Sequence, residues 1–518
     1  MDLISSLSIA TSGLNAIEQE YAVTSNNVAN SSTSGYVSET ATLTSSVVSG
    51  QGNGVTVGTT LLNINTALQS SLYSQNATVA SYTAISDSLS AVSAVQGSTS
   101  SDSGSTATLA DELGNVQTAL TSLTSSPETS SAQTTVISDA DSLVSTIQTL
   151  ASTYAQQRQT AEDNISSSVS TINTDLTQIG AISEQIVAVK AAGGDTSALE
   201  NQRLEVMTSL SSEVSVSFTE KSNGDMVVTT ADGTQLPTRP DQVGEDDSTV
   251  TIPTSTWPLS TTDDTISASS YYSATGSTAG GISGIMLNGK DITTHLTGGT
   301  LGGNITLRDQ TYPQMQAQLD SFSYTLMNRF ANAGMALFTN GTTDTTTDPS
   351  DATADAPAGL VGLSSQLSVS STYTDDPTLL ATDGDTTLAT TVLSEAFGTS
   401  TDDVSGTSSV TGTSLTAPST GLGPDGSQST GYTGSQGLVA LATALTADQG
   451  ATISDASSNL TSATSVQTTL QTQVSNVSGV NVDDEMAKVV TLQNSYTANA
   501  KLISSIQTMF EALMSAID

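Results

Sequence analysis

The sequence predicts a multidomain α+β protein. In this architecture, terminal heptad helices pair as a coiled-coil-like unit, an elongated helical bundle forms the body, and mainly-β structure is inserted into it. Three observations predict this fold class. The 518 residues exceed what one hydrophobic core usually serves. Apolar residues recur at heptad spacing at both ends of the chain. Four prolines and many turn residues within 214–308 are typical of a sheet domain set into a helical body.

The N-terminal stripe advances in alternating steps of four and three residues. Ala10 and Thr24 are its weak members. We expect the helix to end where an asparagine cluster leads into a Ser/Thr-Gly segment, because Asn and Gly tolerate the left-handed backbone that closes helices. The residues that we assign to the N-terminal assembly seam and its end signature are Leu3, Leu7, Leu14, Ile17, Tyr21, Val28, Asn26, Asn27, Asn30, Gly35 and Tyr36.

The C-terminal stripe repeats this pattern over six successive heptad positions. Three carboxylates, Asp483, Asp484 and Glu485, mark its first turn, where the helix dipole favours negative charge. The predicted helix is about 50 Å long at 1.5 Å per residue. Its predicted assembly seam consists of Val482, Met486, Val489, Leu492, Tyr496, Ile503, Ile506, Phe510, Leu513 and Ile517.

A single stripe of this kind is typical of a surface helix packed on its own domain. Two stripes at opposite ends favour pairing with each other, which brings the termini together. A two-helix unit is marginally stable, so we expect the termini to fray in the monomer and to become ordered when neighbouring subunits cover their remaining faces.

The segments between the stripes divide into helical and β regions. We expect a hairpin in which Val214–Phe218 turns at Asn223-Gly224-Asp225 into Met226–Val228. The predicted domains are a terminal helical axial domain (1–40 and 479–518), a helical body (41–213, 309–339 and 435–478), an inserted β domain (214–308) and a Thr/Ser/Asp-rich insertion of β or loop structure (340–434).

Composition excludes several classes of function. With 10 basic and 50 acidic residues the net charge is −40, and no Lys/Arg cluster offers a surface to nucleic acid or anionic lipid. The N-terminus lacks the pattern of a cleaved signal peptide, and no apolar run reaches the length of a membrane helix, so we expect neither Sec-type export nor membrane insertion.

The sequence offers little for catalysis or metal binding. There is no cysteine and a single histidine, His295, so we predict no enzyme activity, no catalytic residue, no cofactor and no metal. Paired aspartates are the best candidates for calcium, but without a full calcium loop we interpret them as solvated acidic surface. These pairs are Asp246-Asp247, Asp263-Asp264, Asp375-Asp376 and Asp402-Asp403.

Both termini resemble the axial proteins of the bacterial flagellum, which comprise rod, hook and hook-associated proteins. The N-terminal signature is Ser12-Gly13-Leu14-Asn15-Ala16, followed by Ser25-Asn26-Asn27-Val28-Ala29-Asn30 and Thr33-Ser34-Gly35-Tyr36. The C-terminal counterpart is Ser478-Gly479-Val480-Asn481-Val482-Asp483, followed by Leu492-Gln493-Asn494-Ser495-Tyr496. The middle of the sequence distinguishes between the members of this class. There the segment Gly193-Gly194-Asp195 with Leu199-Glu200-Asn201-Gln202-Arg203-Leu204 resembles the hook-associated protein 1 family, the FlgK type.

The resemblance implies a structural protein at the junction between hook and filament, exported unfolded through the flagellar type III apparatus and therefore extracellular without a cleaved signal peptide. It also implies as partners further copies of the chain in a ring or helical layer, the hook protein, the second hook-associated protein and an export chaperone. Two alternatives remain open. The chain is another axial protein of the hook type, or it is a secreted Ser/Thr-rich surface adhesin, for which paired terminal seams have no explanation.

Overall fold

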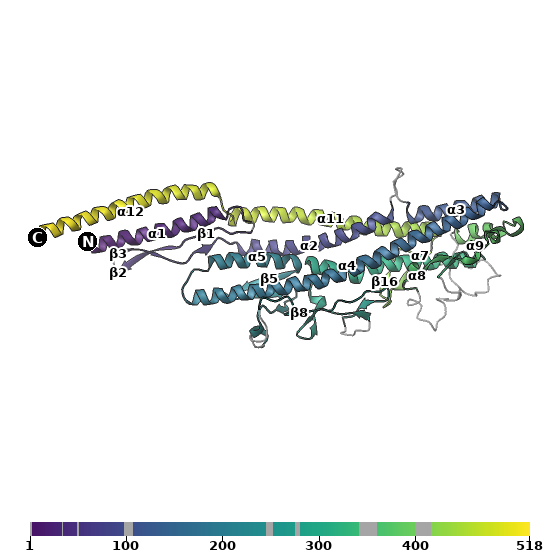
Figure 1. Ribbon diagram of the computed structural model, residues 1–518, viewed down its shortest axis with the longest axis horizontal. Coiled ribbons are helices and arrows are strands. Elements are labelled where there is room, and N and C mark those ends of the chain that lie inside the picture. Colours follow the sequence, from purple (N-terminus) through teal and green to yellow (C-terminus); the bar gives the residue numbers. More distant parts are fainter. Residues whose placement is uncertain are drawn as a thin grey trace.

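The computed structural model shows one long rod with both termini at the same narrow end (Figure 1). The structure describes residues 3–33, 35–48, 51–97, 107–244, 252–274, 280–340, 360–398 and 416–517. Long helices lie along the rod axis, strands such as β5 (Val216–Glu220) and β8 (Leu259–Ser260) lie on one side of its middle section, and β2 (Leu43–Val48) and β3 (Gln51–Val57) lie at the narrow end (Figure 1). The predicted fold class of terminal helices, helical body and small inserted sheets is therefore confirmed.

The narrow end is formed by α1 (Leu3–Ala29) and α12 (Val482–Ile517), which run antiparallel and side by side. A hairpin of β2 (Leu43–Val48) and β3 (Gln51–Val57) packs on α1. We call these two helices and the hairpin the terminal unit. Residues 41–57 were predicted in the helical body, and this assignment is wrong, because Val55 donates its backbone N–H to the Ser12 hydroxyl of α1 at 3.1 Å.

The base of the terminal unit is tied to the body by short strands and backbone hydrogen bonds. Strand β1 (Glu39–Thr40) pairs antiparallel with β4 (Leu61–Leu62). Ser38 donates its backbone N–H to the carbonyl of Ser478 at 2.8 Å, where the last body helix ends. The chain therefore leaves and re-enters the terminal unit at one place.

The body is a bundle of long helices. They are α2 (Thr66–Gln96), α3 (Leu109–Ser125), α4 (Ser130–Ala191), α5 (Ser197–Glu213), α7 (Tyr312–Asn332) and α11 (Leu438–Ser478). The longest, α4, spans 62 residues and contributes to both large hydrophobic clusters. One cluster lies among α3, α4, α7 and α11, and the other joins the C-terminal half of α4 to α5 and the strands.

The described residues of the β region form two three-stranded antiparallel sheets and a small parallel pair. The predicted hairpin is present as β5 (Val216–Glu220) and β6 (Met226–Thr230), with Val216 opposite Thr230. Its turn requires Gly224, whose φ of 97° favours glycine. The remaining strands are β7 (Gln235–Leu236), β8 (Leu259–Ser260), β9 (Tyr271–Tyr272), β10 (Gly281–Ile282), β11 (Met286–Leu287) and β12 (Lys290–Asp291).

The predicted β domain extends too far at its C-terminal end. Residues from Gly299 onward form α6 (Gly299–Thr306) and a π turn (Leu307–Thr311) that leads into α7. The glycines of this segment allow the helix to lie against α2. A Cβ atom at Gly303 would lie 2.7 Å from the carbonyl oxygen of Ser81, so only glycine permits the contact.

The described parts of 340–434 are not a separate β or loop insertion. They form the short helices α8 (Leu363–Gln366), α9 (Ser371–Asp375) and α10 (Thr387–Thr391). Strand β14 (Ser368–Val369) pairs with β13 (Phe338–Thr339), which precedes the insertion, and β15 (Thr420–Leu422) pairs with β16 (Gln428–Ser429). Leu367, Leu380 and Phe397 belong to the main hydrophobic cluster. Spaced apolar residues among many threonines therefore suffice to attach this segment to the body. The rest of the insertion lies outside the described residues.

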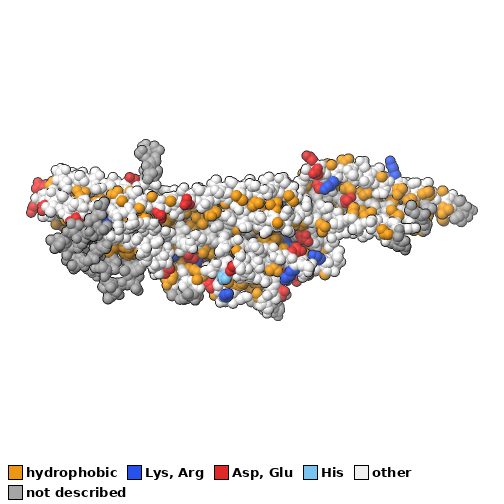
Figure 2. Space-filling model, turned by 180° about the vertical axis from the view of Figure 1, so that it is seen from behind, with side chains coloured by type: hydrophobic (Ala, Val, Ile, Leu, Met, Phe, Trp, Pro, Cys, Tyr) orange, Lys and Arg blue, Asp and Glu red, His pale blue; other side chains and the backbone are white. Residues whose placement is uncertain are grey.

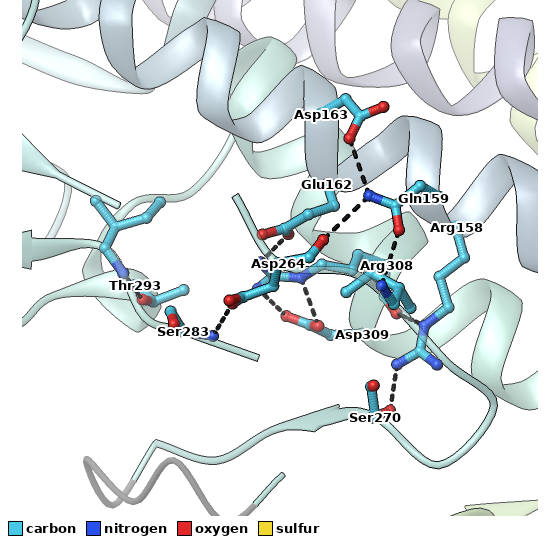
Figure 3. Close-up of polar contacts among 12 residues, drawn as sticks. Arg158, Gln159, Glu162, Asp163, Asp264, Ser270, Ser283, Thr293, Arg308 and Asp309 are labelled. Carbon is cyan, nitrogen blue, oxygen red and sulfur yellow. Dashed lines mark hydrogen bonds and ion pairs between the residues drawn. The ribbon is translucent and has the colours of Figure 1, made fainter. Parts of the chain in front are cut away.

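A buried ion network joins the β region to α4 (Figure 3). The Arg308 guanidinium is fully buried and donates to Glu162 at 2.6 Å and to Asp309 at 2.8 Å. Arg158 donates to the backbone carbonyls of Ser270, at 2.7 Å, and of Arg308, at 2.8 Å. Burial lowers the pKa of Arg158 to about 10. The scarce arginines thus stabilise the interior.

Candidate assembly surface at the paired termini

The contact between α1 and α12 is made by small side chains. Ala10 is 2% exposed and Thr24 is 4% exposed, although their size made them the weak members of the predicted stripe. Between them Gly13 faces Asn499, whose amide nitrogen lies 3.4 Å from the position of a Cβ atom built on the glycine. Small residues of α1 let the two helices approach closely, and Ile17, Leu492 and Ile506 are the larger side chains of the predicted stripes that are buried there.

The predicted N-terminal seam residues lie on both sides of this contact. Ile17 is buried, and Leu7, Leu14 and Val28 are half-buried. Tyr21 is 42% exposed and is not buried between the two helices, so its role in assembly stays a prediction. The backbone of Leu3 begins α1, and its side chain lies outside the described residues.

The predicted C-terminal seam divides in the same way. Leu492 and Ile506 are buried against α1, and Val489, Ile503 and Phe510 are half-buried. The remaining described side chains are exposed and are not buried against α1, so their role in assembly stays a prediction. They are Val482, Met486, Tyr496 and Leu513. The side chain of Ile517 lies outside the described residues.

The inner face of α12 follows a heptad series that starts at Glu485 and continues through Leu492, Asn499 and Ile506. Sequence reasoning missed Glu485 and Asn499 because it followed apolar residues. Leu492 and Ile506 lie two heptads apart. The same seven-residue step places Asn499 between them and Glu485 one step before Leu492, and this is the signal that leads to both polar positions.

The asparagine cluster closes α1 and fixes the following segment. Asn27 is 1% exposed, donates to the carbonyl oxygen of Glu39 at 2.9 Å and accepts the Glu39 backbone N–H at 2.9 Å. The Tyr36 hydroxyl also donates to Asn27, at 3.1 Å, and burial followed by the Glu39 charge raises the pKa of this tyrosine. Asn26 donates to the Glu39 carboxylate, and Asn30 donates back to Asn26. Gly35 follows with a φ of 80°.

The motif 199–205 connects the terminal unit to the body. Asn201 on α5 donates to the Glu39 carboxylate at 3.2 Å and accepts the backbone N–H of Val37 at 3.0 Å. Two residues later, Arg203 is 3% exposed and donates to Glu220 of β5 at 2.8 Å. This one helix therefore orients both the terminal unit and the β region.

Apolar side chains remain exposed on the terminal unit, and hydrophobic side chains reach the surface of the narrow end in Figure 2. They are Ile4, Tyr21, Leu43, Val47, Val482, Met486, Val490, Tyr496, Leu502, Met509, Leu513 and Met514. One groove of about 530 Å³ runs between α1 and α12 and has Ile17, Tyr21 and Tyr496 in its walls. Exposed apolar surface on this scale marks interaction sites in soluble proteins.

The other candidate sites show no arrangement for chemistry. The Nδ1 atom of His295 contacts both Asp232 and the Thr234 hydroxyl, so the ring does not connect an acid to a nucleophile through its two nitrogens. Asp264 accepts the backbone N–H of Ser283, and Asp376 accepts that of Thr378. Among the described residues no group of three or more acidic or histidine side chains could hold a metal ion. The pairs Asp246-Asp247 and Asp402-Asp403 lie outside them.

No described helix has both the length and the hydropathy that a bilayer crossing requires.

Comparisons with known proteins match both termini and the body. Residues 7–36 match the family described as flagella basal body rod protein, and residues 471–516 match the C-terminal family of the flagellar basal body rod FlgEFG proteins. Paired terminal helices with these signatures define a flagellar axial protein. Residues 98–346 match the flagellar hook-associated protein FlgK helical domain. The chain is an axial protein of the hook-associated FlgK type, a structural family.

One similar solved structure is the flagellar hook junction protein FlgK from Burkholderia pseudomallei, with 21% sequence identity and a TM-score of 0.40. The alignment covers 53% of this chain and 46% of that protein, so this chain spans less than half the length of the relative. No curated protein matches the sequence.

Proposed function

We propose that this chain forms the junction between hook and filament in the bacterial flagellum, and that neighbouring subunits cover the exposed faces of its terminal helices. The observation that carries the proposal is the combination of a FlgK-type helical domain with a terminal unit whose apolar side chains remain exposed. A heterologous contact repeated by a screw operation builds a ring or helical layer from such subunits.

The proposed partners are further copies of this chain, the hook protein on one face and the second hook-associated protein on the other, with an export chaperone before assembly. We further propose export as an unfolded chain through the flagellar type III apparatus, which makes the protein extracellular without a cleaved signal peptide. The absence of cysteine from the sequence supports this route, because no disulfide has to be undone.

The match to the FlgK helical domain favours the junction over the hook-type alternative. The rod-type matches at both termini favour an axial protein over a secreted adhesin. A structural role without enzyme activity is the function that the site supports.

Deletion of the gene tests the junction role. We expect complete hooks without filaments, and filament subunit released into the medium. Normal filaments on the deletion strain would contradict the proposal.

Substitutions in the complemented strain test the terminal helices. Leu14→Asp or Ile503→Asp should abolish assembly, because each change places a charge at a half-buried position of the contact between the terminal helices. Circular dichroism of each purified variant checks that the body stays folded.

A further inference from the structure

A second groove, on the other flank of the helix pair, is acidic. It has a volume of about 470 Å³ and lies between α1, α12 and β1. Four carboxylates line it, from Glu20, Glu39, Asp484 and Glu485, and the one cation in its wall is Lys488. The groove therefore carries a net negative charge at neutral pH.

Glu485 has one paired and one unpaired carboxylate oxygen in this groove. Its side chain is 5% exposed, and its Oε1 atom accepts a hydrogen bond from Lys488 Nζ at 2.7 Å. The Oε2 atom is buried and has no hydrogen-bond partner among the described residues. An unpaired carboxylate oxygen in such a place costs free energy, which a donor entering the groove would recover.

The arrangement of the carboxylates favours a long basic side chain over a metal ion. No three acidic side chains of the described residues converge on a point where an ion could sit. The carboxylates are instead spread along the groove wall, from α1 to β1 and the first turn of α12. A lysine ammonium group on a flexible stem can reach one of them and keep its stem against the threonines of the wall.

The chain itself carries one suitable lysine on the terminal unit. Lys501 is exposed on α12 and makes no ion pair with a described residue. Lys190 and Lys221, in contrast, already lie beside Glu220 and Asp225. The 16 residues from Glu485 to Lys501 correspond to about 24 Å along the helix, so Lys501 cannot enter the groove of its own chain.

We propose that this acidic groove receives Lys501 of a neighbouring copy of the chain, and that the contact repeats from copy to copy. The proposal rests on the assembly function above and names one interface within it. Charge complementarity supports it: a subunit with a net charge of −40 meets its neighbour where an exposed lysine of one copy faces a groove lined by four carboxylates of the other.

Zero-length carbodiimide cross-linking of flagella that contain the chain tests this contact. We expect a bond between Lys501 and Asp484 or Glu485, identified by mass spectrometry. Because about 24 Å of rigid helix separates these residues within one chain, such a bond joins two copies. A groove peptide cross-linked to a lysine of another protein would overturn the proposal.

Charge reversal of the purified full-length chain gives a second test. We expect self-association, measured by sedimentation velocity at low ionic strength, to weaken at least tenfold in Lys501→Glu and in Glu20→Lys/Asp484→Lys, and to recover in the triple variant. Lys290→Glu removes an exposed lysine of the β region and should have no effect.

The proposal would also be overturned by a wild type that stays monomeric, by a Lys501→Glu variant that associates like the wild type, or by calcium binding that is lost in Glu485→Gln. Normal filament assembly by Lys501→Glu would refute the groove contact alone, whereas normal filaments in the deletion strain would refute the junction role.

Discussion

The body and the terminal unit use long helices in different ways. Helix α4 is surrounded by partners and has buried positions along its whole length, from Gln133 to Ile186. Helix α12 has one helical partner, and Glu485, Leu492 and Ile506 are its only described side chains below 9% exposure. Neither large hydrophobic cluster includes a described residue of α1 or α12. A helix packed on one side keeps its other faces for neighbouring subunits, whereas a helix packed on all sides supports the fold.

The largest contrast is expected from two truncations at equally buried positions. Phe330 of the body is fully buried, and its ring packs edge-on against Phe338 and Phe397 with centroids 4.9 and 5.7 Å away. Phe330→Ala should cost about 4 kcal/mol in the free energy of unfolding. Ile506→Ala, at 3% exposure in the terminal unit, should leave the main unfolding transition in place. Urea denaturation measures both, and an equal loss would show that the terminal unit unfolds with the body.

A smaller effect is expected when the buried network of the body loses its central cation. Arg308→Met leaves the Glu162 carboxylate, which is 1% exposed on its side chain, without its partner. We expect a loss of about 3 kcal/mol, measured by thermal unfolding. The matched control Lys290→Met removes a charge from an exposed strand position. Equal melting temperatures for the two variants would contradict the role of the network.

A pH-dependent effect is expected from a buried acid of α4. Burial, opposed in part by a bond to Ser209 and increased by the Glu213 charge, raises the pKa of Asp175 to about 6. Its Oδ2 atom has no hydrogen-bond partner among the described residues. Because the folded-state pKa lies above the ordinary value, this group favours folding while protonated, and stability falls as the pH rises from about 4 through about 6.

Asp175→Asn should therefore stabilise the chain by up to about 2 kcal/mol at pH 7.5 and leave it unchanged or weaker at pH 4.5. The control is Asp141→Asn, an exposed change on the same helix. Melting temperatures across this pH range measure the difference. A gain in stability for Asp175→Asn that is the same at both pH values would contradict the assignment.

The smallest effect concerns the hairpin of the terminal unit. Gly54 has a φ of 99°, and a Cβ atom there would lie 2.0 Å from the Ser12 hydroxyl. Gly54→Ala should weaken hairpin packing on α1 by about 1 kcal/mol and speed limited proteolysis near residue 50. Gly52→Ala is the control, because a Cβ atom there meets no atom within 4 Å.

Hydrogen exchange tests the order of the terminal helices in the monomer. Backbone amides before Gly35 and after Asp483 should show little protection.

Local patterns predicted the helix ends well. The asparagine cluster marks the end of α1 at Ala29, and the three carboxylates lie in the first turn of α12. The turn at Gly224 also produced the predicted β5–β6 hairpin. The predicted β domain ran too far at its C-terminal end, where the glycines of α6 serve close packing on α2. That packing depends on the position of α2, which the local sequence does not contain.

The heptad spacing by itself determined that both termini are long helices with a seam, because that period belongs to the backbone geometry of the α-helix. Only the tertiary structure decided which residues of the stripe meet. Ala10, Gly13 and Thr24 form the contact because small side chains allow close approach of α1 to α12, and this approach leaves Tyr21 and Tyr496 on the surface. Which face of a helix is covered depends on the partner helix, and the spacing within one helix does not contain that information.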